Sequence, residues 1–237
     1  MLGDYVQQGG KLMVMAGPVE DGTLENLYSI LSDYGVTPVD GIVVEGDREH
    51  YAFQAPFVLM PDMADTDLTS SLIEERYYPI LPLAQGMTVD GTASGATVTE
   101  LLTTSESSFS KIAGYDMENY EKEEGDLDGP FAVGVSVECT SGGQIIWFSS
   151  SAFLDDMYNA YSSGANGDLA MNALSALIGE REALAIRSKS LNYNFLTISE
   201  STASLLKTVM IGICPLGCLG IGILAVLRRR RNQNAPV

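Results

Sequence analysis

The chain has 237 residues and a formal net charge of −18 at pH 7, with 31 Asp and Glu against 13 Lys and Arg. All of the acidic residues precede residue 205, and a surface this negative excludes binding to nucleic acid or anionic lipid by charge. Two interpretations of the acidity stay open. One is a solvated surface kept soluble by self-repulsion; the other is a weak calcium site, although no D-x-D-x-D-G loop occurs.

The first part of the chain alternates predicted helices with predicted strands. The opening segment LGDYVQQGGK predicts a short amphipathic helix that stops at Gly9 and Gly10. The apolar run Lys11–Gly17 is typical of a buried parallel strand. Thr23–Tyr34 has apolar residues at helical spacing, and Ile42–Glu45 predicts a short strand. This order indicates a repeating α/β unit.

The middle of the chain predicts short strands and polar connections. Strands are expected at Phe57–Met60, Tyr78–Ala84 and Thr97–Thr103. Lys111–Asp128 is strongly acidic and is interpreted as a surface loop with room for a short helix.

The next part of the chain carries the clearest patterns. Phe131–Cys139 and Gln144–Ser149 have strong β character, and the intervening Ser-Gly-Gly turn predicts a hairpin or two adjacent strands. Asn166–Ile178 predicts an amphipathic helix with Asn166 as its N-cap. Two further short strands are expected at Ala183–Ile186 and Phe195–Ile198.

Twenty consecutive uncharged, mostly apolar residues lie near the C-terminus, at Thr208–Leu227. At about 1.5 Å per residue they extend over roughly 30 Å, the thickness of the hydrocarbon core of a bilayer. Arg228, Arg229, Arg230 and Arg231 follow at once and predict a cytoplasmic tail, because basic residues beside a span stay inside. The sequence therefore predicts a cell-membrane protein with a single C-terminal span and an extracytoplasmic bulk.

Small residues define one face of the predicted span: Cys214, Cys218, Gly222 and Ala225. Such a face permits close helix–helix approach and predicts packing against a partner helix; the alternative is that these are ordinary small residues of a membrane core. No secretory signal peptide occurs at the start, although a charged domain of this size needs one for export. We therefore expect either a fragment or a chain whose N-terminal part is lost or mis-annotated.

Candidate catalytic groups are few. His50 is the single histidine and follows a polar stretch, while Cys139 ends a predicted strand instead of occupying a strand-to-helix elbow. No G-x-S-x-G, P-loop or G-x-G-x-x-G motif is present. We therefore expect no catalytic, cofactor or metal site. Asp155 and Asp168 follow the carboxyl end of a predicted strand and are interpreted as contact-loop residues, with helix capping or plain surface charge as the alternative.

Several segments, taken in order, resemble the C-terminal part of the GldG-like family, the gliding-motility-type auxiliary proteins of ABC transporters. The segments are YVQQGGKLMVMAGP, LENLYSILSDYGVTPVDGIVVE, LLTTSESSF, GPFAVGVSVE, IIWFSSSAFLDD, NGDLAMNALSALIGERE, IRSKSL and the closing LRRRR. Each is a structural signature, and their order and spacing over nearly the whole chain carry the resemblance.

The resemblance implies a fold and a domain organisation. The fold is a class I glutamine-amidotransferase-like (flavodoxin-like) α/β sheet domain without the catalytic apparatus, N-terminally incomplete, followed by one transmembrane helix. An extracytoplasmic auxiliary domain is expected over residues 1–200. A transmembrane helix with its lead-in is expected over 201–227, and a basic cytoplasmic tail over 228–237.

The resemblance also implies a function. It is that of a non-enzymatic accessory subunit of an ABC-2-type transport system, acting outside the membrane beside a separate permease and ATPase and without cofactors. Two rival hypotheses stay open. One is a membrane-anchored module that binds a solute or polysaccharide on its own. The other is a hydrolase of the same fold with Cys139 and His50 as nucleophile and base.

Overall fold

The computed structural model describes residues 1–91, 95–179, 207–213, 215–216 and 222. The chain divides into two units, Met1–Ser190 and Leu191–Val237. The helices of the first unit are α1 (Leu2–Gln7), α2 (Glu25–Ser32), α3 (Ser70–Glu75), α4 (Asp156–Tyr161) and α5 (Ala165–Ile178), with 3-10 turns η1 (Arg48–His50) and η2 (Gly114–Asp116). Its strands are β1 (Lys11–Met15), β2 (Val36–Pro38), β3 (Ile42–Val44), β4 (Val58–Leu59), β5 (Asp62–Met63), β6 (Leu81–Pro82), β7 (Met87–Val89), β8 (Ala96–Thr103), β9 (Phe109–Lys111), β10 (Leu127–Asp128), β11 (Ala132–Cys139) and β12 (Gln144–Phe148).

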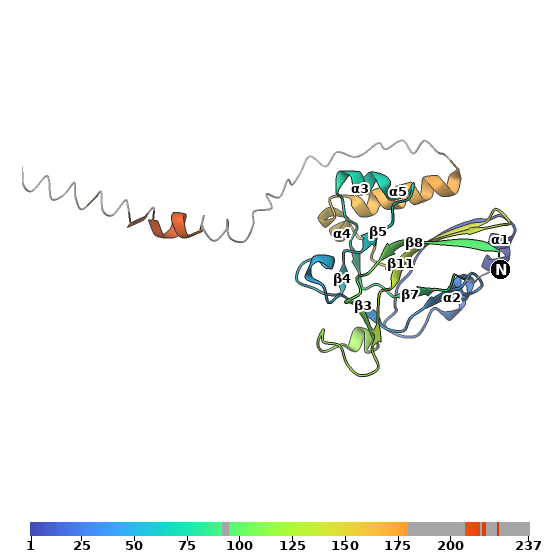
Figure 1. The fold of residues 1–237 in the computed structure, drawn as a ribbon, viewed down its shortest axis with the longest axis horizontal. Coiled ribbons are helices and arrows are strands. Elements are labelled where there is room, and N and C mark those ends of the chain that lie inside the picture. The colour runs from blue at the N-terminus through green and yellow to red at the C-terminus, as the bar shows by residue number, and fades with distance from the viewer. Residues whose placement is uncertain (92–94, 180–206, 214, 217–221, 223–237) are drawn as a thin grey trace, which may run out of the picture. The chain divides into compact units, whose positions relative to one another are not determined.

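The strands form a mixed set of sheets (Figure 1). The largest has the order β1-β12-β11-β7-β2, with β8 paired to β11 and β5 paired to β8. Its β1–β12 pair is parallel, whereas β11 runs antiparallel to β12, β7 and β8. The smaller sheets, β10-β9-β3 and β4-β6, are antiparallel.

This topology corrects the predicted flavodoxin-like fold. The connection from β11 to β12 is a tight turn, and a tight turn can join only antiparallel strands, since a parallel pair needs a long crossover. The strand expected to continue a parallel α/β unit, β3, instead pairs antiparallel with β9 in a separate sheet. The architecture is therefore a mixed α/β domain with several sheets.

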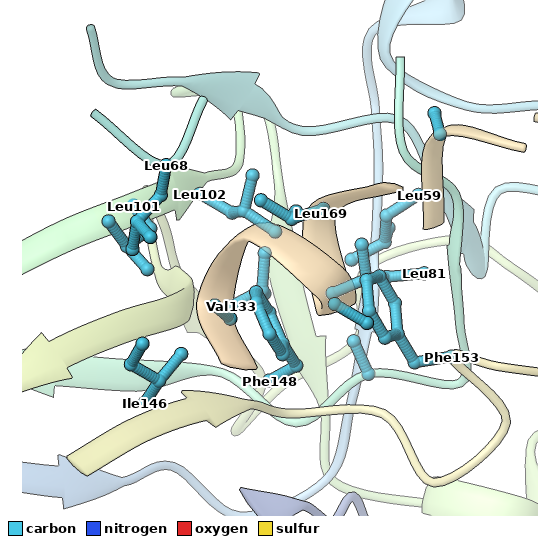
Figure 2. Close-up of a cluster of buried hydrophobic side chains, with 14 of the residues drawn as sticks. Leu59, Leu68, Leu81, Leu101, Leu102, Val133, Ile146, Phe148, Phe153 and Leu169 are labelled. Atoms are coloured by element: carbon cyan, nitrogen blue, oxygen red, sulfur yellow. The ribbon is translucent and has the colours of Figure 1, made fainter. Parts of the chain in front are cut away.

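Helices cover both faces of the largest sheet and produce two cores. Ile146 and Phe148 of β12 lie in the core beneath α5, which contributes Leu169; Figure 2 shows these side chains together. Ile145 and Trp147 belong to the opposite core, which also contains residues of α1 and α2. This alternation is the period of a β-strand buried on both faces.

A β-bulge lets β11 serve both cores. Val133 lies in the α5 core and Val135 in the α2 core, although residues two apart on a regular strand share a face. The register shifts between Ala132 and Gly134 and again between Gly134 and Val135. A Cβ at Gly134 would lie 3.0 Å from Leu102, so the bulge also depends on the absence of a side chain there.

Helix α5 has the predicted extent but not the predicted N-cap. Gly164 occupies the cap position, and Asn166 is fully buried two residues later, within the first turn. The Asn166 side chain accepts from the amide of Ile80 at 2.8 Å and donates to the carbonyls of Ile80 and Phe153 at 2.8 and 2.6 Å. A buried amide with its groups satisfied thus joins α5 to the β6 region.

The predicted membrane span is corrected by the structure. Among the described residues, none of the helices combines the length and apolar character needed to cross a bilayer. On this finding the predicted span at Thr208–Leu227 and the single-pass cell-membrane localisation derived from it are wrong. In the described part of that segment Val209–Ile213 is a five-residue π-helix. Pro215 follows closely, and proline disturbs the preceding helical turn because its ring clashes with the carbonyl four residues earlier.

Candidate binding groove

A groove of about 300 Å³ lies at the sheet edge where β1 and β12 end. The two strands are parallel, so their carboxyl ends meet at the same edge, where α/β sheets place ligands. Gly17, two residues beyond β1, packs against the segment that follows β12. A Cβ at Gly17 would lie 2.8 Å from the carbonyl oxygen of Ser149 and 3.2 Å from that of Leu83. A larger residue at this position would therefore displace the backbone beneath the groove.

Three segments form the walls of the groove. The first wall is the β1–α2 loop with the start of α2, the second is the β2–β3 turn, and the third is the stretch after β9 that contains η2. Gln85 closes the floor, where its amide nitrogen donates to the Ser149 carbonyl at 2.9 Å and its Nε2 to the Val39 carbonyl at 3.0 Å. The lining residues are Gly17, Pro18, Val19, Glu20, Gly22, Thr23, Leu24, Glu25, Tyr28, Pro38, Asp40, Gly41, Gln85, Ile112, Ala113, Gly114, Tyr115 and Asp116.

Two tyrosines fix the first wall. The buried Tyr28 donates its hydroxyl to the carbonyl of Ala16 at 3.1 Å, and its ring lies 4.9 Å from that of Trp147. Burial raises the pKa of Tyr28 far above its usual value, with a smaller opposite effect from Trp147, so the hydroxyl remains a donor. Tyr115 of the third wall donates to the Pro18 carbonyl at 3.0 Å and joins the first wall to the third.

The second wall is a tight turn pressed onto the end of β9. Gly41 has a φ of +98°, the left-handed region that favours glycine, and a Cβ there would collide with the backbone of Lys111. Ser110 donates its hydroxyl to the carbonyl of Asp40 at 2.6 Å. The backbone of this turn is therefore tied directly to β9.

A buried lysine holds the third wall. The Lys111 side chain is 1 % exposed; its Nζ donates to the carbonyl of Glu121 at 2.6 Å and lies 3.3 Å from Glu123 Oε1 and 3.8 Å from Asp126 Oδ2. The Asp126 carboxylate accepts from the amides of Ile112 and Glu123 at 3.0 and 2.9 Å. The acidic loop is thus folded around a compensated charge, as a buried lysine requires.

The pKa of Asp126 reflects this cluster. Burial by itself raises the pKa of the carboxyl, but hydrogen bonds from the amides of Glu123 and Ile112, together with the charges of Lys111 and Lys122, lower it below its usual value of 3.8. Asp126 is therefore ionised at neutral pH and keeps Lys111 paired.

The charge facing the groove is entirely negative. Glu20, Glu25, Asp40 and Asp116 contribute exposed carboxylates from all three walls, and the lining contains no Lys, Arg or His. Lys111 is next in the chain to the lining residue Ile112, but its ammonium is buried among its own partners. The groove therefore presents acidic and apolar groups to a ligand.

The predicted site residues lie elsewhere. Asp155 is the N-cap of α4 and accepts from the amide of Met157 at 2.9 Å. Asp168 lies in the first turn of α5, where burial raises its pKa. Neither lines the groove.

The predicted helix-packing face and basic tail are mostly outside the described residues. Gly222 is an exposed helical residue. The others are not described: Cys214, Cys218, Ala225, Arg228, Arg229, Arg230 and Arg231.

The rival nucleophile and base have separate surroundings. His50 Nδ1 lies 3.2 Å from Asp47 Oδ2 and its Nε2 3.3 Å from Asp62 Oδ2, both near η1. Cys139 ends β11 beside Tyr34; burial, and after it the Cys139 thiol, raise the pKa of Tyr34 well above its usual value. Among the described residues no group of three or more His, Cys, Asp and Glu is arranged to hold a metal ion.

No protein-family model matches this chain, and no curated protein sequence matches it. Among solved structures the chain is similar to the N-terminal domain of mmIFT52, with a TM-score of 0.51 and 16% identity, over 74% of this chain and 68% of that one. At this identity the likeness shows the fold alone. It agrees with a mixed α/β domain and overturns the predicted amidotransferase-like fold.

Sequence reasoning missed the groove and the lysine that supports it. The lining comes from segments as distant as Gly17, Gln85 and Tyr115, whose adjacency no local pattern records. Two signals were present in the sequence: Gly17-Pro18 at the end of a predicted strand, and the isolated Lys111 at the head of an acidic run. A lone cation beside many carboxylates indicates a charge that can be buried with partners.

Proposed function

We propose that this chain is a non-catalytic accessory subunit of an ABC-2-type transport system, which works by binding a partner and depends on a separate permease and ATPase. The ordered segments that resemble the GldG-like family suggest the system. The observation that carries the binding role is the groove, because three walls from distant segments converge on the carboxyl ends of β1 and β12.

The chemistry of the groove suits recognition. The hydroxyls of Tyr28 and Tyr115 donate to backbone carbonyls and so maintain the walls. The side chains left to face a ligand are exposed carboxylates and apolar groups such as Ile112 and Val19. Such a lining can hold a partner by charge and apolar contact, and it offers no paired nucleophile and base.

Affinity isolation tests this proposal. A tagged full-length chain is expressed in its source cells, captured in mild detergent after brief cross-linking, and its partners are identified by mass spectrometry. The expected result is an ABC ATPase and a multi-span permease at amounts comparable to the bait. Recovery of the intact, abundant protein without either would overturn the accessory-subunit proposal and favour a module that binds a solute or polysaccharide alone.

A further inference from the structure

We propose that the groove takes an arginine-bearing extended segment of a partner protein. The inference rests on the accessory-subunit proposal and specifies what the groove recognises. Glu25, Asp40 and Asp116 bring negative charge from three different walls, and no basic side chain among the lining residues opposes it. A concave surface lined by one sign of charge concentrates its field and attracts the opposite sign.

The third wall adds a surface suited to a guanidinium. Tyr115 remains 41 % exposed although its hydroxyl is held by the Pro18 carbonyl, so its ring orientation is fixed and its face is accessible. A planar guanidinium stacks on an aromatic ring while it hydrogen-bonds to a carboxylate, and Asp116 is the next residue in the chain. Arginine fits this pairing better than lysine.

Apolar groups favour a peptide over a free amine. Val19 of the first wall and Ile112 of the third are 39 % and 52 % exposed, and Pro18 and Pro38 also line the groove. Each exposed carboxylate by itself attracts a small cation only weakly, because water screens the charge. A segment that places arginines against the acidic walls and apolar side chains between them uses both kinds of surface.

The structure leaves this charge available. Lys111, the nearest lysine along the chain to the third wall, is compensated by Glu123 and Asp126 on the loop beyond the groove. Within the described residues, the groove carboxylates therefore form no ion pair with a basic side chain, whereas Lys122, farther along the same loop, pairs with Asp128. Because the acidic loop folds around Lys111, the ammonium of this lysine is paired away from the groove. The carboxylates that line the groove therefore keep their negative charge uncompensated.

Peptide titration of the full chain tests the inference. The probe is a fluorescein-labelled hexapeptide that carries two arginines separated by apolar residues, and its matched control has citrulline at both arginines. Binding is measured by anisotropy at low and physiological salt. The arginine peptide is expected to bind about tenfold more tightly than the citrulline peptide, with the difference shrinking as salt rises. Equal binding of the two peptides overturns the inference.

Charge-matched variants locate the site. The double variant Glu25→Gln/Asp116→Asn removes two groove carboxylates and is expected to weaken the arginine peptide by about five- to tenfold. The control Asp33→Asn/Glu124→Gln removes two exposed carboxylates outside the groove and is expected to stay within about twofold. Equal losses in the two double variants would mean general attraction to an acidic surface and would overturn the inference.

Two further experiments refine the test. Variants of Tyr115 separate the contribution of its ring from that of its hydroxyl, and competition with a small amine distinguishes a peptide site from an amine site. Tyr115→Phe keeps the ring and is expected to retain binding, whereas Tyr115→Ala is expected to lose several-fold in affinity. Spermidine that displaces the probe at the probe's own concentration would identify a small-amine site and contradict a peptide site. The titration needs no ATPase or permease. Its failure, with those partners still recovered in affinity isolation, leaves the accessory-subunit proposal in place.

Discussion

The first and third walls of the groove are built in different ways. The third wall folds around Lys111 and Asp126, whose side chains are 1 % and 4 % exposed. The first wall, the β1–α2 loop with the start of α2, is tied to its neighbours by the hydroxyls of Tyr28 and Tyr115, which donate to the carbonyls of Ala16 and Pro18. One wall thus has an ionic core of its own, and the other is attached to its neighbours. We infer that the third wall is preformed and that the first adjusts to a ligand.

Removing the lysine should break the third wall and give the largest effect. Lys111→Ala leaves Asp126 buried without its cation, and loss of one partner from a buried pair is expected to cost about 3 kcal/mol in the free energy of unfolding, measured with urea. The control is Lys122→Ala, which breaks an exposed pair with Asp128 and is expected to cost less than about 1 kcal/mol. Equal losses would contradict a buried ionic core in the third wall.

Removing the charge of Asp126 should lower the stability of the protein by an amount that depends on pH, which tests the ionic core of the third wall. Asp126→Asn weakens the hydrogen bonds from Ile112 and Glu123, so we expect a loss of about 1–2 kcal/mol at pH 7. The folded pKa of Asp126 lies below its usual 3.8, so its contribution is complete above that value and disappears as pH falls through the folded pKa. Unfolding curves from pH 7 to pH 2 should therefore converge for variant and wild type. A constant difference across that range would argue against the pairing.

The attached wall should respond locally and more weakly. Tyr115→Phe deletes the bond to Pro18 and is expected to cost about 1 kcal/mol or less. Hydrogen exchange should become faster in the β1–α2 loop and stay unchanged at the amide of Glu123, which bonds to Asp126. Faster exchange in both regions would show that the two walls open together.

The smallest effect has the opposite sign and comes from Asp168, outside both walls. Burial raises its pKa, so the ionised form is disfavoured in the folded state. That cost is absent at pH values below the unfolded pKa of about 3.8 and grows as pH rises through the higher folded pKa. Asp168→Asn should therefore raise the thermal midpoint slightly at pH 7 and leave it unchanged near pH 2. A lowered midpoint at pH 7 would mean that the carboxylate has a stabilising partner.

Elements with strong local patterns could be predicted from the sequence. The β11–β12 pair, β8 and α5 occur close to the expected bounds because alternation or helical spacing runs through them, with turns or glycines at their ends. The direction of pairing could not be predicted in the same way. Strands such as β7 and β9 have three residues each, too few for a pattern, and they decide which sheets form.

Buried polar residues were the main source of error at the level of single positions. Asparagine is a favoured N-cap residue, yet Asn166 forms hydrogen bonds with Ile80 and Phe153 across the core. Lys111 begins an acidic stretch that is typical of a solvated loop, yet it is fully buried. Tertiary partners far away in the chain satisfy Asn166, and a loop that folds back satisfies Lys111. Periodicity records neither arrangement.

The most direct test of the account compares affinity isolation of the wild-type chain with that of Glu25→Gln/Asp116→Asn and its charge-matched control. If the groove binds the partner, the wild type and Asp33→Asn/Glu124→Gln recover an ABC ATPase and a permease, and the groove variant recovers several-fold less of both. Equal recovery with all three proteins would contradict recognition through the groove. Recovery of neither partner with any of them would contradict the role as an accessory subunit.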